Sequence, residues 1–262
     1  MRAIASLLLL ALLASPACAQ PGSLHIEDLT WTEVRDAVAS GKTTAIYYAG
    51  STEQNGPHMA LGKHNFIARQ VAQRIAAALG NALVYPILPF APTGDARKLT
   101  DHMRFPGSVS VSETTFAAVA RDVATSAIAA GFRNVVLMGD HGGGQEALAR
   151  VAAELTRQWD AKGFRVHYIA DLYYQSNQQA TEYLAQRGLK PGAHAGLGDT
   201  SELMALDSAG RWIRRGKLAP GGAANGVEGD PRQASIELGE RLIKFKVGAA
   251  VAQIRALLAQ RR

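Results

Sequence analysis

Four short apolar runs, interleaved with segments of helical spacing, set the strongest limit on how this 262-residue chain can fold. The runs lie at 45–49, 82–90, 134–138 and 164–171. Strands that alternate with helices in this way pair in parallel, because each helix carries the chain back across the sheet. Prolines in the second run place that strand at an edge of the sheet or shorten it. We therefore expect an α/β fold with a mainly parallel sheet and helices on both faces.

The boundaries of the helices are also marked in the sequence. Two capping boxes, at 30–33 and 110–113, open helices that end near Gly41 and Gly131. The other expected helices span 66 to about 80, 145–162, 175–186 and 202–206. A last one runs from Pro231, capped by Asp230, to the C-terminus, with an interruption near Gly248. No linker or internal repeat interrupts this pattern. Residues 20–262 are therefore expected to form a single domain.

The first 19 residues have the pattern of a signal peptide. A basic start at Arg2 precedes an apolar core, and small residues lead up to a cleavage site after Ala19. This pattern predicts a periplasmic or secreted protein. Cleavage also removes Cys18, the one cysteine of the chain, so the mature protein would have no catalytic thiol, disulfide or sulfur metal ligand.

The charge distribution argues against two classes of partner. The chain carries a formal net charge of +6, but it has no basic run interleaved with aromatic residues, so nucleic-acid binding is not expected. After removal of the signal peptide no other long apolar run remains, and we expect no contact with a membrane.

Three glycine-rich loops contain acidic and imidazole side chains. Residues 50–65 and 139–144 each follow an apolar run, and residues 192–201 form the third loop. Ligands bind at the carboxyl ends of the strands in open α/β sheets. If the first and third strands are neighbours, Glu53, His64 and His141 share one pocket. Nitrogen and oxygen donors gathered in this way predict a metal site.

The same loops resemble the signatures of the creatininase (creatinine amidohydrolase) family. The family sequence Glu-Gln-His-Gly-Pro-His-Leu-Pro-Leu-Gly-Thr-Asp corresponds to residues 53–64, Asn-Gly-His-Gly-Gly-Asn to 139–144, and His-Ala-Gly-Glu-x-Glu-Thr-Ser to 194–201. The resemblance implies a three-layer α/β/α domain with a mainly parallel sheet and a homo-oligomer, commonly a hexamer. It also implies metal-dependent hydrolysis of a cyclic or linear amide C–N bond in a small molecule.

Two residues depart from the family's two-metal site. The bridging Asp is replaced by His64, and a His ligand of the second ion by Asn55. A neutral imidazole offers one lone pair and cannot bridge two ions as a carboxylate does. We therefore expect the two-metal site to be lost or rebuilt. Glu53, His64 and His141 remain as ligands of a single ion, with Zn²⁺ expected and Mn²⁺ or Fe²⁺ as alternatives.

Several roles remain open at this point. Asp140 either orients His141 or helps to rebuild a second metal position, and Asp199 is a fourth ligand or the general base. In the expected mechanism Asp199 accepts a proton from metal-activated water, and His194 or His58 donates one to the departing nitrogen.

Three side chains are candidates for contact with the substrate. Asn55 either hydrogen-bonds the substrate or is a turn residue, and His58 has the alternative role of bracing its loop. His102 lies in a long irregular segment, 91–109, of the kind that is often functional, and contacts the substrate or a neighbouring subunit.

Other functions fit the same residues. A degenerate relative would keep the pocket and bind a small molecule or a metal without catalysis. A different metallohydrolase specificity, such as deformylation or peptide trimming, is the second alternative. A serine hydrolase is disfavoured because the chain has no Gly-x-Ser-x-Gly sequence.

Overall fold

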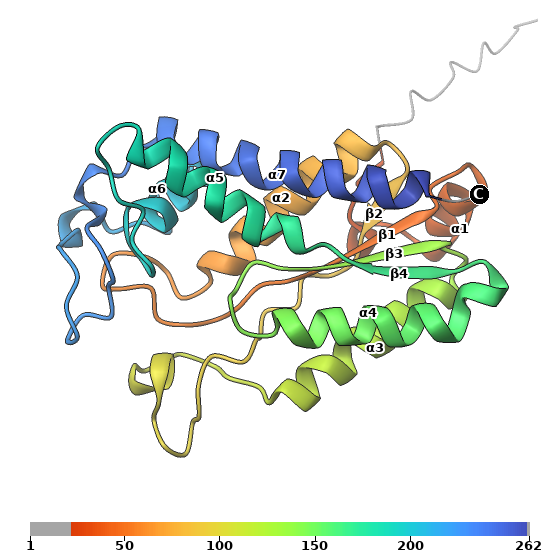
Figure 1. The fold of residues 1–262 in the computed structure, drawn as a ribbon, viewed down its shortest axis with the longest axis horizontal. Coiled ribbons are helices and arrows are strands. Elements are labelled where there is room, and N and C mark those ends of the chain that lie inside the picture. Colours follow the sequence, from red (N-terminus) through yellow and green to blue (C-terminus); the bar gives the residue numbers. More distant parts are fainter. Residues whose placement is uncertain (1–21, 261–262) are drawn as a thin grey trace, which may run out of the picture.

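The computed structural model describes residues 22–260, and the expected signal peptide, 1–19, lies outside the described residues. A four-stranded sheet with the order β2-β1-β3-β4 forms the middle layer (Figure 1). The strands are β1 (Thr44–Ala49), β2 (Ala82–Val84), β3 (Asn134–Gly139) and β4 (Arg165–Tyr168). All three strand pairs are parallel, as expected.

Helices cover both faces of this sheet. They are α1 (Trp31–Ala39), α2 (Lys63–Leu79), α3 (Glu113–Ala129), α4 (Gln145–Trp159), α5 (Tyr174–Ala185), α6 (Leu197–Leu206) and α7 (Ile236–Ala259). Figure 1 shows α2, α5 and α7 above the sheet and α3 and α4 below it. The expected three-layer α/β/α architecture is confirmed.

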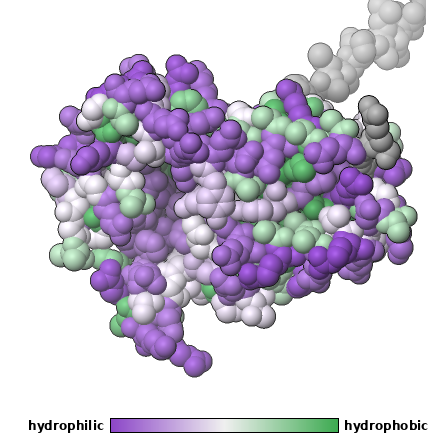
Figure 2. All heavy atoms as spheres, in the orientation of Figure 1, coloured by the Kyte–Doolittle hydropathy of each residue, from purple (hydrophilic) through white to green (hydrophobic). Residues whose placement is uncertain are grey.

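The core is divided in two by the sheet. Successive strand residues point to opposite faces, so Ile46 and Tyr48 pack with α2 and α7, whereas Ala45 and Tyr47 pack with α3 and α4. All six residues of β1 are buried, which explains why this strand is a continuous apolar run rather than an alternating one. The face of the molecule seen in Figure 2 is mainly hydrophilic, with hydrophobic residues in smaller patches.

The first helix after β1 begins earlier than its apolar spacing indicates. We expected it from residue 66 to near Gly80. Helix α2 spans Lys63–Leu79, so its end is as expected, and Gly80, whose φ is 78°, is its C-cap. Lys63 and His64 are therefore part of the first helical turn and not of the loop. Both side chains are buried, which places them in the interior next to the end of β1.

The second strand is shorter than expected and lies at an edge of the sheet. It ends at Val84 rather than at residue 90. Beyond this point the chain keeps only intermittent contact with β1, through the hydrogen bonds that Tyr85 N and Leu88 N donate to Ile46 O and Tyr48 O. Pro86 and Pro89 have no N–H to donate, and they interrupt the ladder here.

Two other helices, α3 and α6, do not start at the expected residues. The N-cap of α3 is Ser112 and not Ser110. Helix α6 was expected from residue 202 but begins at Leu197, so Asp199 lies on its first turn.

The last helix was expected to start at Pro231 and to be interrupted near Gly248. Instead Pro231–Gln233 forms a separate 3-10 turn, and α7 starts after Ser235 and continues through Gly248. Ser235 Oγ accepts a hydrogen bond from Leu238 N, which makes it the N-cap. No helix within residues 22–260 is long and apolar enough to cross a membrane.

Candidate metal centre

The carboxyl ends of β1 and β3 bring two of the three glycine-rich loops together. These strands are neighbours in the sheet, and Ala49 pairs with Gly139 at their ends. The chain therefore leaves both strands at the same edge, with Glu53 following β1 and His141 following β3. His64 comes from the start of α2, which packs on the same edge.

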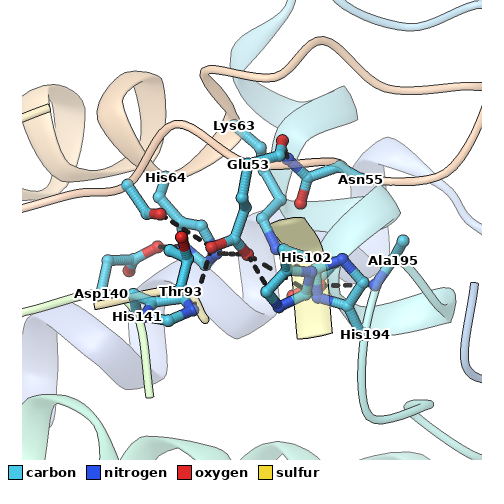
Figure 3. A network of polar contacts seen from close by, with 12 residues as sticks. Glu53, Asn55, Lys63, His64, Thr93, His102, Asp140, His141, His194 and Ala195 are labelled. Atoms are coloured by element: carbon cyan, nitrogen blue, oxygen red, sulfur yellow. Dashed lines mark hydrogen bonds and ion pairs between the residues drawn. The ribbon is translucent and has the colours of Figure 1, made fainter. Parts of the chain in front are cut away.

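Glu53 is the centre of the polar cluster shown in Figure 3. Its side chain has no exposed surface. One carboxylate oxygen, Oε1, lies 3.1 Å from His64 Nε2, and the other, Oε2, lies 2.9 Å from His141 Nε2. Ser51 Oγ also donates to Oε2 at 2.7 Å. The structure thus brings together the three residues that the sequence placed in one pocket.

Two more imidazoles face the same carboxylate. His102 Nε2 and His194 Nδ1 both lie 3.8 Å from Glu53 Oε1. His102 is held by Gln54, whose side-chain amide lies 3.1 Å from its Nδ1. His194 is held through Nε2, which donates to Gln54 O at 2.8 Å. The structure therefore places His102 beside the expected ligands, and the 91–109 segment supplies part of the centre.

The donor set fits a divalent metal ion. Glu53, His102 and His141 each offer one ligand atom, and these atoms lie within 4.8 Å of one another. Two imidazoles and one carboxylate with space for a further ligand are the set found in catalytic zinc sites. Gly143 N donates to His141 Nδ1 at 3.0 Å, so Nε2 carries the ring proton and donates it to Glu53 Oε2, and an ion at Nε2 would require the other tautomer of the ring. His64, which lies between Glu53 and Asp140, already compensates part of the charge of the buried Glu53, and a bound cation would take over this role.

Asp140 contacts His64 and not His141. Its Oδ2 lies 2.7 Å from His64 Nδ1, and its Oδ1 accepts from Tyr48 Oη at 3.0 Å and from Lys246 Nζ at 2.9 Å. Lys246 also donates to Glu202 Oε2 at 2.6 Å. Asp140 thus orients the imidazole of His64, as carboxylates do behind metal-binding histidines.

The electrostatics of these carboxylates follow from their partners. Burial raises the pKa of Glu53, but the nearby His64 and His141 outweigh burial and hold the pKa well below its ordinary value. Burial likewise raises the pKa of Asp140, and Lys246 and His64 reverse this effect. Both groups are therefore carboxylates at neutral pH, as ligand and orienting roles require.

Asp199 pairs with a buried lysine. Its Oδ2 accepts from Lys63 Nζ at 2.7 Å and from Ala195 N at 2.8 Å. Burial raises the pKa of Asp199, whereas Lys63 and then His194 lower it, and the result is a pKa far below the ordinary value. Burial, followed by the charge of Lys63, lowers the pKa of His194 to about 4.

Two of the predicted site residues lie behind the loop. His58 is fully buried and its Nε2 lies 2.9 Å from Thr200 Oγ1. Asn55 is fully buried and its Nδ2 donates to Glu53 O at 2.8 Å. Neither side chain lines the cavity that the described residues form beside Glu53. The structure therefore places both where they brace the loop.

A cavity of about 440 Å³ adjoins the cluster. Its polar walls include Glu53, Lys63, Asp199, Glu202 and Lys246. A second cavity, of about 630 Å³, shares His102 and Glu228 with the first and extends along the 220–229 loop. The volume next to Glu53 is sufficient for a small polar molecule.

The sequence interpretation missed Lys63, Glu202 and Lys246. One signal for Lys246 is present in the sequence, because it lies among Leu242, Ile243 and Ala250 on the buried face of α7. A charged residue at such a position needs a buried partner. Lys63 and Glu202 could not be recognised in this way. The predicted starts of α2 and α6 were too late, so Lys63 was placed in a loop and Glu202 at a helix end, where a charged residue is not unusual.

The chain has an α/β/α fold with a buried carboxylate among imidazoles at the carboxyl end of a parallel sheet, an arrangement that fits a metal-binding site. The family model described as creatinine amidohydrolase matches residues 27–254. The chain therefore belongs to the creatininase family, as its loop sequences indicated.

Comparison with individual proteins agrees with this assignment. A creatinine amidohydrolase of Pseudomonas putida is 30% identical over 119 residues, which cover 45% of each protein. This alignment thus spans less than half of that relative. A mycofactocin precursor peptide peptidase of Mycolicibacterium smegmatis is 28% identical over 79% of this chain and 82% of its own length. A solved mutant creatininase of the Zn-Zn type superimposes with a TM-score of 0.77 at 22% identity, covering 89% of this chain and 98% of that one.

Proposed function

We propose that this protein hydrolyses an amide C–N bond of a small molecule, cyclic or linear, with one bound divalent metal ion. The observation that carries the proposal is the buried carboxylate of Glu53, with His64 Nε2 at 3.1 Å and His141 Nε2 at 2.9 Å. A buried carboxylate flanked by imidazole nitrogens offers the oxygen and nitrogen donors that a divalent ion binds. The polar cavity beside it leaves space for a substrate.

The names of the relatives support the reaction class more than any substrate. One relative is a creatinine amidohydrolase and another a peptide peptidase, so the two act on different molecules through an amide-type bond. The solved relatives include a Zn-Zn form and an Mn form, so they do not choose between these ions. The imidazole and carboxylate donors favour Zn²⁺ here, with Mn²⁺ and Fe²⁺ as alternatives.

Glu53 and His141 would hold the ion, with His102 or His64 completing the set. A bound divalent ion lowers the pKa of water and polarises a carbonyl group. The other groups of the cavity orient the reactants. Asp140 keeps the Nε2 atom of His64 directed toward Glu53 through its hydrogen bond to Nδ1.

His194 is the proton acceptor that the geometry favours. Its Nε2 donates to Gln54 O, so the lone pair of its neutral ring is on Nδ1, which faces Glu53. Asp199, the expected base, already accepts two hydrogen bonds. Its pKa is also far lower than that of His194, which is about 4. We assign the uptake of the proton from water, and its return to the departing nitrogen, to His194 Nδ1.

The test combines metal analysis with turnover. Purified protein is stripped of metal, reloaded with Zn²⁺, Mn²⁺ or Fe²⁺, and assayed on lactams, formamides and short peptides. Glu53→Gln keeps the size of the side chain and removes its charge, so we expect it to lose both the bound ion and turnover. Glu146→Gln is the matched control, because Glu146 is 87% exposed on α4.

Two results would contradict the proposal. The first is full turnover in a Glu53→Gln variant that contains no metal. The second is a wild-type protein that binds no ion and hydrolyses none of the panel, which would support the alternative of a degenerate binding protein.

Export to the periplasm or secretion, and assembly into a homo-oligomer, are part of the proposal. Export is supported by the sequence pattern of residues 1–19, and assembly by the family resemblance. Cell fractionation and light scattering of the purified protein test the two points separately.

A further inference from the structure

Lys63 is a buried cation on the wall of the cavity beside Glu53. It lies on the first turn of α2, next to His64, and only 1% of its surface is exposed. Its ammonium group makes one ion pair, 2.7 Å from Asp199 Oδ2. Burial of an ammonium group is costly, and a single carboxylate in α6 offsets only part of that cost.

The ammonium group has donors to spare. A lysine ammonium carries three N–H groups, and within residues 22–260 Asp199 is its one hydrogen-bond partner. The cavity that Lys63 lines is therefore the place where the other two donors can be satisfied. Lys246 differs, because two carboxylates, Asp140 and Glu202, already accept from its Nζ.

The charge of Lys63 also acts on the site at Glu53. The side chain points toward the group that contains His102 and His194 (Figure 3). Lys63 lines the same cavity as Glu53, His102 and His194. A positive charge in the wall of the cavity repels a divalent ion held at Glu53 in the same cavity.

On the basis of the proposed function, we propose that Lys63 is a resident cation of the active site. It limits the cavity to one divalent ion and donates to an acceptor oxygen of the bound substrate. Asp199 is then a positioning residue that holds the ammonium group in place. A substrate with a carbonyl or carboxylate oxygen near the scissile amide fits this arrangement.

Opposite charge changes at the two partners test the proposal without an activity assay. Lys63→Met removes the repelling charge, and we expect Zn²⁺ to bind about tenfold more tightly or better. Asp199→Asn leaves Lys63 unopposed, and we expect Zn²⁺ to bind about tenfold more weakly or worse. The measurement is a titration with Zn²⁺ against a competing chelator, with the ion-to-chain ratio read by elemental analysis.

A purely structural ion pair predicts a different pattern. If Lys63 and Asp199 only stabilise the loop, both variants weaken the binding of Zn²⁺, and that result overturns the proposal. Two ions per wild-type chain in excess Zn²⁺ also overturn it. Lys190→Met is the charge control, because Lys190 is exposed, and we expect it to leave the affinity for Zn²⁺ unchanged.

Failure of this inference is distinguishable from failure of the proposed function. If wild-type protein binds no Zn²⁺, the metal centre itself is wrong. If it binds one ion that Glu53→Gln abolishes, but Lys63→Met fails to tighten binding, only the role of Lys63 is wrong. The contact with the substrate is tested in the amide panel, where Lys63→Met should raise KM for a substrate with an added acceptor oxygen more than for its analogue without one.

Discussion

At the level of single residues, the site is a set of buried charges that compensate one another. Glu53 is surrounded by imidazoles, Asp199 pairs with Lys63, and Asp140 shares Lys246 with Glu202. Removing one member of a buried pair leaves a charge without a partner, which costs more than the pair contributes. The residue-scale predictions therefore concern single substitutions in these groups.

Lys246→Met should strongly destabilise the fold. The substitution nearly keeps the length of the side chain but removes the cation that Asp140 and Glu202 share, so His64 is left as the ion-pair partner of Asp140 and Glu202 loses its ion pair. We expect a loss of about 3–5 kcal/mol in the free energy of unfolding, measured with urea. As a control, Arg121→Met removes an exposed ion pair with Glu154 and should cost about 1 kcal/mol or less. Equal losses in the two variants would contradict the account.

Asp140→Asn should weaken the metal site without direct contact between Asp140 and Glu53. The neutral amide accepts less strongly from His64 Nδ1, so the ring loses its orientation and part of its basicity. Changes of this kind behind a metal ligand typically cost about 10–100-fold in metal affinity. An unchanged affinity for Zn²⁺ would exclude His64 from the ligand set and leave Glu53, His102 and His141.

Part of this site was readable in the sequence and part was not. Glu53 and His141 stand in glycine-rich loops after apolar runs, and that pattern alone indicated a shared pocket. His102 was expected at the substrate, but the fold of 91–109 directs its Nε2 toward Glu53. The partners of Asp140 and Lys63 come from α7 and α6, and spacing along the chain carries no information about such contacts.

At the level of elements, close packing between α6 and α7 holds Glu202 and Lys246 together. Gly239 on α7 allows this approach, since a Cβ atom there would lie only 1.9 Å from Ser201 O on α6. Backbone cannot move aside as a flexible side chain does. The position therefore requires glycine for space, not for its conformation.

Gly239→Ala should consequently destabilise the fold, by about 1–3 kcal/mol, as overpacking usually does. Gly248→Ala, in the same helix, is the matched control, because nothing lies within 4 Å of its added Cβ atom. There we expect stabilisation of up to about 1 kcal/mol from helix propensity. Urea unfolding of both variants gives the comparison, and a neutral Gly239→Ala would show that α6 and α7 are not packed this closely.

The elements themselves were predicted better than their ends. Apolar runs located all four strands, but prolines ended β2 at Val84, six residues before the run ended. Helices α2 and α6 start at Lys63 and Leu197, earlier than expected. The prediction placed both starts too late because the apolar pattern begins only after the first turn, which carries Lys63 and His64 in α2 and Asp199 in α6. Apolar spacing indicates only the buried face of a helix, so a prediction based on it does not detect first turns that carry polar residues.

At the level of the whole molecule, alternation of strands and helices was sufficient to predict the layers and the parallel sheet. It did not give the strand order, because the sequence leaves open which strands are neighbours. The order β2-β1-β3-β4 is decisive for function, since it places the ends of β1 and β3 side by side. Glu53 and His141 meet for this reason.

The central claim is that Glu53 and His141 hold a single divalent ion. Anomalous X-ray diffraction at the zinc edge, from crystals equilibrated with Zn²⁺, tests it directly. We predict one peak per chain, about 2.0–2.2 Å from a carboxylate oxygen of Glu53 and from His141 Nε2. No peak at Glu53, or a second peak beside Asp199 at the position of the Lys63 ammonium group, would contradict the account.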